Sequence, residues 1–273
     1  DDTLKFDSVF TQKRYFEAYL WGAAGQLPDE SRIFGHEYAP GITAGDDIFT
    51  VMSSDIFRGS AFALGYVNPD NLRGMNVWSD MYKVIRKANL MLARMDECQD
   101  MTALDRRNYT GYIHFLRGYA YYHILMTCGP AILVGDEIFE SNLDGPAYNT
   151  YRATYDETVE YICSELETAA AYLPLKASIA QFERPTKGAA YALIARLRLH
   201  AASPLFNGTS TARLYFGNWK RTYDKEYYIN QNYSEEKWAL AAAACKRVID
   251  MNVYELFTVS KDQNTPQLPA GVP

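Results

Sequence analysis

Residues 154–174 read TYDETVEYICSELETAAAYLP, and this stretch decides the fold class. Its apolar residues recur at alternating intervals of four and three, so they share one face of an α-helix. They are Tyr155, Val159, Ile162, Leu166, Ala169 and Leu173. Thr154 and Glu157 have the spacing of a capping box, and Pro174 ends the pattern. The stretch therefore predicts an amphipathic helix that packs one face against its neighbours.

Helical periodicity extends over most of the remaining chain. It predicts further helices at about 8–25, 76–96, 104–128, 186–202 and from 235 onward. Thr102 and Asp105 resemble a helix start signal, and Gly129-Pro130 is a stop signal. Strand signals are few, because the apolar run at 131–134 is too short to form a sheet.

These helices form pairs of similar length, 76–96 with 104–128 and 151–173 with 186–202. Paired helices with rows of small residues are typical of tetratricopeptide-type repeats, although the strict consensus and a constant period are absent. We expect an all-α fold of tetratricopeptide-like helical hairpins, stacked as an α-α superhelix. Residues 26–75 and 203–233 are expected to form long irregular loops that carry aromatic residues. We expect residues 1–273 to be one helical domain, the N-terminal part of a longer protein.

Composition and motifs argue against several function classes. The formal net charge is -6, which disfavours nucleic-acid binding. The chain has no apolar stretch long enough for a transmembrane helix. It lacks the sequence patterns of nucleotide sites, serine hydrolases and zinc proteases, and no two histidines have the spacing of a metal pair on one helix. The adjacent Asp46 and Asp47 do not make a hydrolase site, which needs two separated carboxylates. We therefore predict no catalytic residue, no metal and no cofactor.

Aromatic content is high, at 14% of residues with 22 tyrosines. Tyrosine can bury its ring while its hydroxyl stays in water. Two interpretations remain open at this point. The rings can form a tyrosine-rich helical core, or some of them can serve as flat platforms for sugar rings.

Five segments, taken in order, resemble one known family. The most specific are WSDMYKVIRKANLMLARM at 78–95, FLRGYAYYHILMTCGPAILV at 115–134 and RPTKGAAYALIARLRLHAASPLFNG at 184–208. The helices at 155–174 and 238–256 match the segments that lie between and after them. Together they resemble the SusD-like (RagB/SusD) family of Bacteroidetes-type bacteria. The chain departs from the family pattern at Cys128, where an aromatic residue is usual.

The resemblance implies a function and a location. Family members are outer-membrane lipoproteins that are anchored by an N-terminal lipidated cysteine and face outward. They cover a SusC-like TonB-dependent transporter, capture oligosaccharides or polysaccharides for it, and do no chemistry. Some members serve peptides instead. Full members are considerably longer than 273 residues, and much of their ligand surface comes from the C-terminal part.

Candidate ligand residues lie in the two loops. Loops near residues 26–75 contribute to the ligand surface in the family, and this region combines rings with planar polar side chains, which suit sugar hydroxyls. The candidates are Asp47, Phe57, Arg58, Tyr66, Asn68, Asn71 and Arg73. Trp219 in the second loop is either a platform or part of the loop core. Trp78 is expected to pack in the core, and Arg117 and Arg196 are expected to anchor helix contacts or backbone carbonyls.

Three functions are compatible with these observations. The first is glycan capture for a SusC-like transporter. The second is a peptide-binding or protein-interaction helical-repeat scaffold without a sugar site. The third is an α-helical glycoside hydrolase, for which the sequence offers no carboxylate pair. The five matching segments favour glycan capture.

Overall fold

The computed structural model describes residues 6–30, 42–46, 48, 50–51, 59–68, 70–72, 76–140, 145 and 150–258. Its α-helices are α1 (Lys13–Ala24), α2 (Ser60–Ala63), α3 (Trp78–Arg94), α4 (Ala103–Cys128), α5 (Tyr155–Tyr172), α6 (Lys187–Ala202), α7 (Ser210–Phe216) and α8 (Glu235–Asp250). The described residues contain no β-strand and only two isolated bridges, one at Asn68–Asn71 and one at Lys220–Tyr227. None of the helices described is long and apolar enough to cross a membrane.

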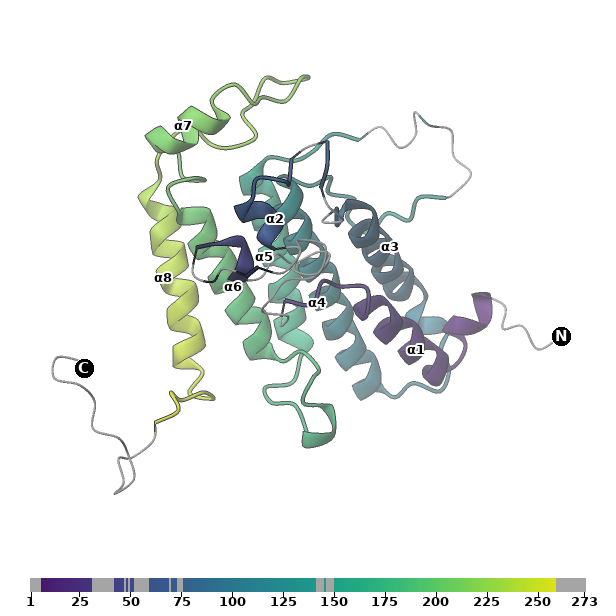
Figure 1. Cartoon of the computed structure of the whole chain (residues 1–273). Helices are drawn as coiled ribbons and strands as arrows, with labels where there is room; N and C mark the ends of the chain where they lie inside the picture. The colour runs from purple at the N-terminus through teal and green to yellow at the C-terminus, as the bar shows by residue number, and fades with distance from the viewer. Residues whose placement is uncertain are drawn as a thin grey trace.

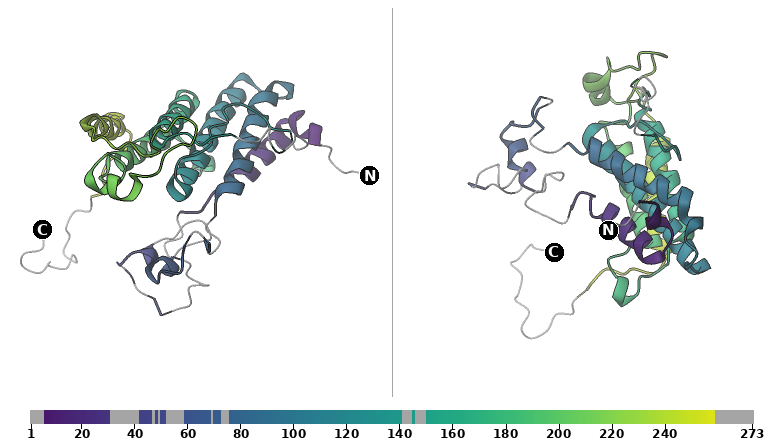
Figure 2. Two further views of the ribbon diagram at one scale, coloured as in Figure 1. Left: turned by 90° about the horizontal axis from the view of Figure 1, so that it is seen from above. Right: turned by 90° about the vertical axis from the view of Figure 1, so that its right-hand side faces the viewer.

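The long helices form a single row in chain order. Helix α3 packs on α4, α4 on α5, α5 on α6, and α6 on α8, while α1 packs against α3 (Figure 1). Both α1 and the segment that carries α2 lie on the same side of this row (Figure 2). The row of helical hairpins confirms the expected all-α, tetratricopeptide-like fold.

Hydrogen-bonded caps fix where the central helices begin. Thr102 accepts a hydrogen bond from the backbone N–H of Asp105, whose carboxylate accepts one from the Thr102 N–H. Thr154 and Glu157 form the same reciprocal capping box before α5. Each box satisfies two of the backbone donors that a helix start leaves unpaired. Both start signals in the sequence are confirmed.

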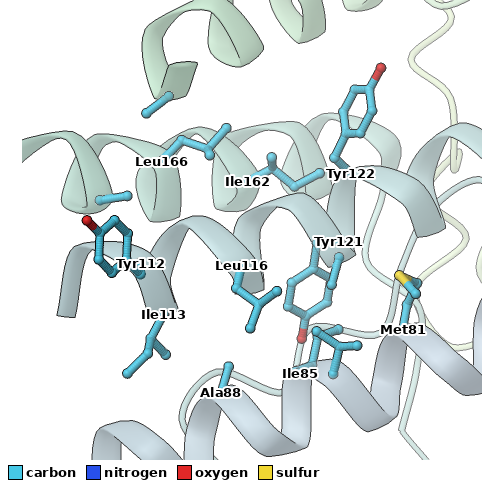
Figure 3. Packing of buried hydrophobic residues seen from close by; sticks show 14 of the residues in the cluster. Met81, Ile85, Ala88, Tyr112, Ile113, Leu116, Tyr121, Tyr122, Ile162 and Leu166 are labelled. Carbon is cyan, nitrogen blue, oxygen red and sulfur yellow. The ribbon is translucent and has the colours of Figure 1, made fainter. Parts of the chain in front are cut away.

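The core lies on both sides of α4. Met81, Ile85 and Ala88 of α3 face α4, and Ile162 and Leu166 of α5 lie on its opposite side (Figure 3). Tyr121 of α4 is fully buried, and its hydroxyl accepts a hydrogen bond from the Val134 N–H at 3.1 Å. Much of the tyrosine content therefore belongs to the core, as the first interpretation of the composition has it.

Two glycines allow α4 and α5 to approach each other closely. A Cβ atom built at Gly118 would lie 3.2 Å from Glu165 Cβ and 3.2 Å from Leu166 Cγ. At Gly111 it would lie 3.0 Å from the backbone nitrogen of Leu173. Side chains larger than hydrogen at these positions would push the helices apart.

A buried polar network connects α3, α4, α5 and the loop after α4. Arg117, only 3% exposed, donates to both carboxylate oxygens of Glu165 at 2.7 Å each. It also donates to Asn89 Oδ1 at 2.8 Å and to Asp136 Oδ1 at 2.6 Å. Burial by itself raises the pKa of Glu165, but the hydrogen bonds from His114 and Arg117 lower it below its usual value. Arg117 thus anchors helix contacts, as predicted.

The structure differs from the sequence expectations at several elements. The helix expected at about 8–25 is divided into a 3-10 turn at Phe6–Phe10 and α1, which begins only at Lys13. The Lys13 N–H donates to the Asp100 side chain at 2.7 Å, which fixes this later start. The two expected loops also contain the short helices α2 and α7, whose few residues give no detectable periodicity.

Candidate ligand-binding surface

The backbone at the end of α2 determines where Tyr66 lies. Gly65 has φ +71°, the left-handed conformation that favours glycine. The Tyr66 N–H donates to Ala61 O at 2.8 Å, and the Gly65 N–H donates to Phe62 O at 3.0 Å. This pair of bonds is a Schellman motif, which closes a helix and sets the direction of the next residue. It leaves the Tyr66 side chain 53% exposed.

Asn68 and Asn71 form a tight turn directly after Tyr66. Their backbones exchange two hydrogen bonds, of 3.1 and 3.0 Å. Asn68 Oδ1 also accepts from the N–H groups of Asp70 at 3.0 Å and Asn71 at 2.9 Å. Such a side-chain turn is a usual role of asparagine. Tyr66, Asn68 and Asn71, three of the predicted ligand residues, therefore lie within one exposed stretch of six residues, in which Asn68 and Asn71 form the turn.

Exposed apolar side chains and a cavity accompany this turn. Phe62 and Leu64 of the α2 segment are 42% and 50% exposed. A cavity of about 490 Å³ lies beside α2 and is lined by Ser60, Leu64 and residues 43–51 in part. Asp46 is its only carboxylate among the described lining residues. The α2 segment thus carries an exposed aromatic ring and forms one wall of a cavity.

Trp219 lies in a different segment and packs into an aromatic stack. Its ring is centred 4.7 Å from that of Tyr228 and 6.1 Å from that of Phe216. An added Cβ at Gly129, at the end of α4, would lie 3.5 Å from its ring edge. Trp219 is thus partly buried among loop residues, as the loop-core alternative expects, and a ligand role for it stays a prediction.

The other predicted residues fall into two groups. Asp47, Phe57, Arg58 and Arg73 lie outside the described residues. Trp78 is partly buried and packs against the core, as expected. Arg196 is 62% exposed, pairs with Glu30 at 2.8 Å and lies over the Tyr122 ring of α4 at 5.7 Å.

One exposed pair of tyrosine rings is not predicted by the sequence. Tyr151 and Tyr223 have ring centroids 4.4 Å apart and are 62% and 51% exposed. They are far apart in sequence, so no local pattern brings them together. Of this pair, only Tyr223 lies in the aromatic-rich 203–233 loop that the sequence indicates. Nothing in the sequence indicates Tyr151 as its neighbour.

The titratable groups of the described residues bear on whether a metal site is present. Within the described residues, no group of three histidine, cysteine or acidic side chains is placed to hold a metal ion. Several shifted pKa values belong to buried tyrosines such as Tyr121 and to ion pairs that join helices, such as Arg117 with Glu165.

Comparison with solved structures shows the fold. A SusD-like protein from Bacteroides fragilis NCTC 9343 superposes with a TM-score of 0.63 at 20% identity, covering 92% of this chain and 40% of the other. A laminarin binding SusD-like protein gives 0.55 at 20% identity over 70% and 41%. Surface glycan-binding protein A from Bacteroides uniformis gives 0.59 at 19% identity over 90% and 48%. The chain thus spans less than half the length of these structures.

Sequence comparison shows the family. No curated protein matches the chain. The SusD-like family described as "starch-binding associating with outer membrane" matches residues 45–199, more than half of the 273 residues and all of α2, α3, α4 and α5. The match contains the Tyr66–Asn71 turn and the helices around it. The chain therefore belongs to the SusD-like family.

Proposed function

We propose that this chain is part of a cell-surface glycan-binding lipoprotein that captures oligosaccharides or polysaccharides. It delivers them to a SusC-like TonB-dependent transporter, and a lipid anchor holds it on the outward face of the outer membrane. The family description and the names of two similar structures, one laminarin binding and one surface glycan-binding, support a glycan as the ligand. The observation that carries the proposal is the exposed stretch after α2, in which Tyr66 lies close in sequence to the turn of Asn68 and Asn71.

Capture at this turn needs no bond to be made or broken. The apolar face of a sugar ring stacks on the exposed ring of Tyr66. The side-chain amides of the neighbouring asparagines hydrogen-bond to the hydroxyls of the sugar. The Schellman motif and the asparagine turn hold these groups in place before the ligand arrives, which lowers the entropy cost of binding. Asp47, Phe57, Arg58 and Arg73 are expected to extend the surface. The chain is proposed to bind and release its ligand unchanged.

Affinity electrophoresis tests the proposal. The chain is run through native gels that contain soluble starch or laminarin, with a gel without polysaccharide as the reference. We expect retardation by at least one polysaccharide. Tyr66→Ala should reduce the retardation. Because one central aromatic contact is lost, the affinity of the chain for the polysaccharide should fall about 5- to 30-fold.

A matched control is Tyr172→Ala, because Tyr172 is a similarly exposed tyrosine at the end of α5. Its retardation should equal that of the wild type. Retardation by neither polysaccharide, combined with tight binding of an unrelated peptide mixture, would support the peptide-binding scaffold instead.

A further inference from the structure

A second concave surface lies between α1, α4 and residues 183–185, away from the turn. It is a cavity of about 440 Å³. This volume lies within the range of about 300–1,000 Å³ that is usual for small-molecule sites. Six side chains give it its chemical character: Trp21, Tyr112, Phe115, Tyr119, Glu183 and Arg184. We call it the α1–α4 pocket.

Aromatic rings form the walls of the α1–α4 pocket. Tyr112, Phe115 and Tyr119 are spaced three and four residues apart, so they share one face of α4. Trp21 approaches from α1, with its ring centred 5.4 Å from that of Tyr112. The rings of Phe115 and Tyr119 are 5.9 Å apart. A flat ligand would therefore meet ring faces from two helices.

The polar groups at the rim have no hydrogen-bond or ion-pair partners within the described part of the chain. No hydrogen bond or ion pair is formed there by the Trp21 indole, the Tyr112 and Tyr119 hydroxyls, or the Glu183 and Arg184 side chains. Arg184 instead stacks over Trp21 at 4.8 Å and over Tyr112 at 6.0 Å. Burial raises the pKa of Tyr119 to about 12, so its hydroxyl remains a hydrogen-bond donor at neutral pH.

This combination selects among ligand chemistries. A purely apolar ligand would cover these polar groups without pairing them, which costs free energy. An ion of either sign would meet one like charge, because the rim carries one carboxylate and one guanidinium. A neutral sugar ring has an apolar face for the aromatic walls and hydroxyls at its edge for the polar rim.

We propose that the α1–α4 pocket is a second glycan site, which holds one neutral pyranose ring. The proposal rests on the proposed glycan-binding function and adds a place and a ligand class to it. Helix α1, which forms one wall, lies on the same side of the helical row as the α2 segment (Figures 1 and 2).

Calorimetric titration with maltoheptaose and laminarihexaose tests this proposal. Arg184→Met removes the guanidinium that stacks on Trp21 and Tyr112 and leaves an apolar side chain in its place. Tyr119→Phe removes a hydroxyl and keeps the ring. Each should lower the affinity for the bound oligosaccharide at least about tenfold, or abolish one of two binding events. Circular dichroism and thermal melts of each variant establish that it folds. Tyr66→Ala, at the other surface, should leave binding in the pocket intact.

Tryptophan fluorescence gives an independent readout. A sugar that stacks on Trp21 should change the emission of the wild type, and Trp21→Phe should remove that change. Binding that is unaffected by Arg184→Met and Tyr119→Phe but lost in Tyr66→Ala would overturn the second site and leave the proposed function standing. Absence of oligosaccharide binding by the wild type would overturn both.

Discussion

Replacing Arg117 by methionine should lower the free energy of unfolding by about 3 kcal/mol. Methionine keeps most of the volume of the arginine stem and removes its charge and donors. Glu165, which is 8% exposed, would then keep only the His114 hydrogen bond at 2.9 Å. Breaking a buried ion pair by removing one partner costs about 3–5 kcal/mol, and the remaining bond to His114 places this case at the lower end.

The magnitude is large for a protein of this kind. Stabilities are commonly about 5–15 kcal/mol, so the change removes a substantial part of the total. At about 2–4 °C for each kcal/mol, the midpoint of thermal unfolding should fall by about 6–12 °C. The double variant Arg117→Met/Glu165→Met should recover part of the loss, because no unpaired buried carboxylate remains.

Urea denaturation followed by circular dichroism measures the effect. Lys83→Met is the control, because Lys83 is 62% exposed and pairs with Asp80 at the surface. It should change the free energy of unfolding by about 0.5 kcal/mol or less. An Arg117→Met loss no larger than that of the control would refute the view that this network holds α3, α4 and α5 together.

The same variant has a pH signature. In the wild type the pKa of Glu165 is lowered, so its contribution to stability is present above the unfolded-state pKa of about 4.3 and is lost as the pH falls through the folded value. Without Arg117, burial should raise the pKa of Glu165. As the pH falls, protonation of Glu165 then removes the cost of an unpaired buried carboxylate in the variant. The difference in free energy of unfolding between wild type and variant should therefore become smaller as the pH is lowered from 7 to 4. A constant difference would contradict the reasoning.

Three other changes test separate parts of the structure. Burial lowers the pKa of His123 to about 4, and its Nε2 has no hydrogen-bond partner. As the pH falls from about 6.5 to 4, the unfolded chain therefore takes up a proton at this histidine before the folded chain does. The free energy of unfolding of the wild type should drop by up to about 3 kcal/mol over this range. His123→Phe should reduce this pH dependence, as measured by urea denaturation at each pH. Gly118→Leu should lower the free energy of unfolding by about 1–3 kcal/mol by overpacking. The control Gly22→Ala, where a Cβ meets nothing within 4 Å, should raise it by up to about 1 kcal/mol. Equal shifts in the midpoint of thermal unfolding would contradict the close approach of α4 and α5. Gly65→Ala should strain the turn by about 1–2 kcal/mol and weaken glycan binding, and unchanged calorimetric affinity would show that Tyr66 does not depend on this turn.

Much of the helical row was predictable because its signals are local. The capping boxes at Thr102 and Thr154 begin helices at the expected residues, and Pro174 and Gly129 lie just beyond their ends. The apolar stripe of residues 155–173 gives a buried face directly, since helical periodicity needs only neighbours in sequence. For the same reason, the stacking of consecutive helices followed from their similar lengths.

The ligand surface was less predictable because its order depends on contacts between distant residues. Composition directed attention to Tyr66, Asn68 and Asn71, but only the backbone hydrogen bonds show that Tyr66 closes α2 and that Asn68 and Asn71 share one turn. The Tyr151–Tyr223 pair and the approach of Trp21 to Tyr112 join segments that are far apart along the chain. No periodicity within one segment carries such information.

The most direct test of the central claim is isothermal titration calorimetry of the chain against soluble starch, laminarin and a set of unrelated peptides, with product analysis of each mixture. We predict saturable binding of at least one glycan, with no products released and no saturable binding of peptides. Peptide binding without glycan binding, or the release of shortened sugars, would contradict the account.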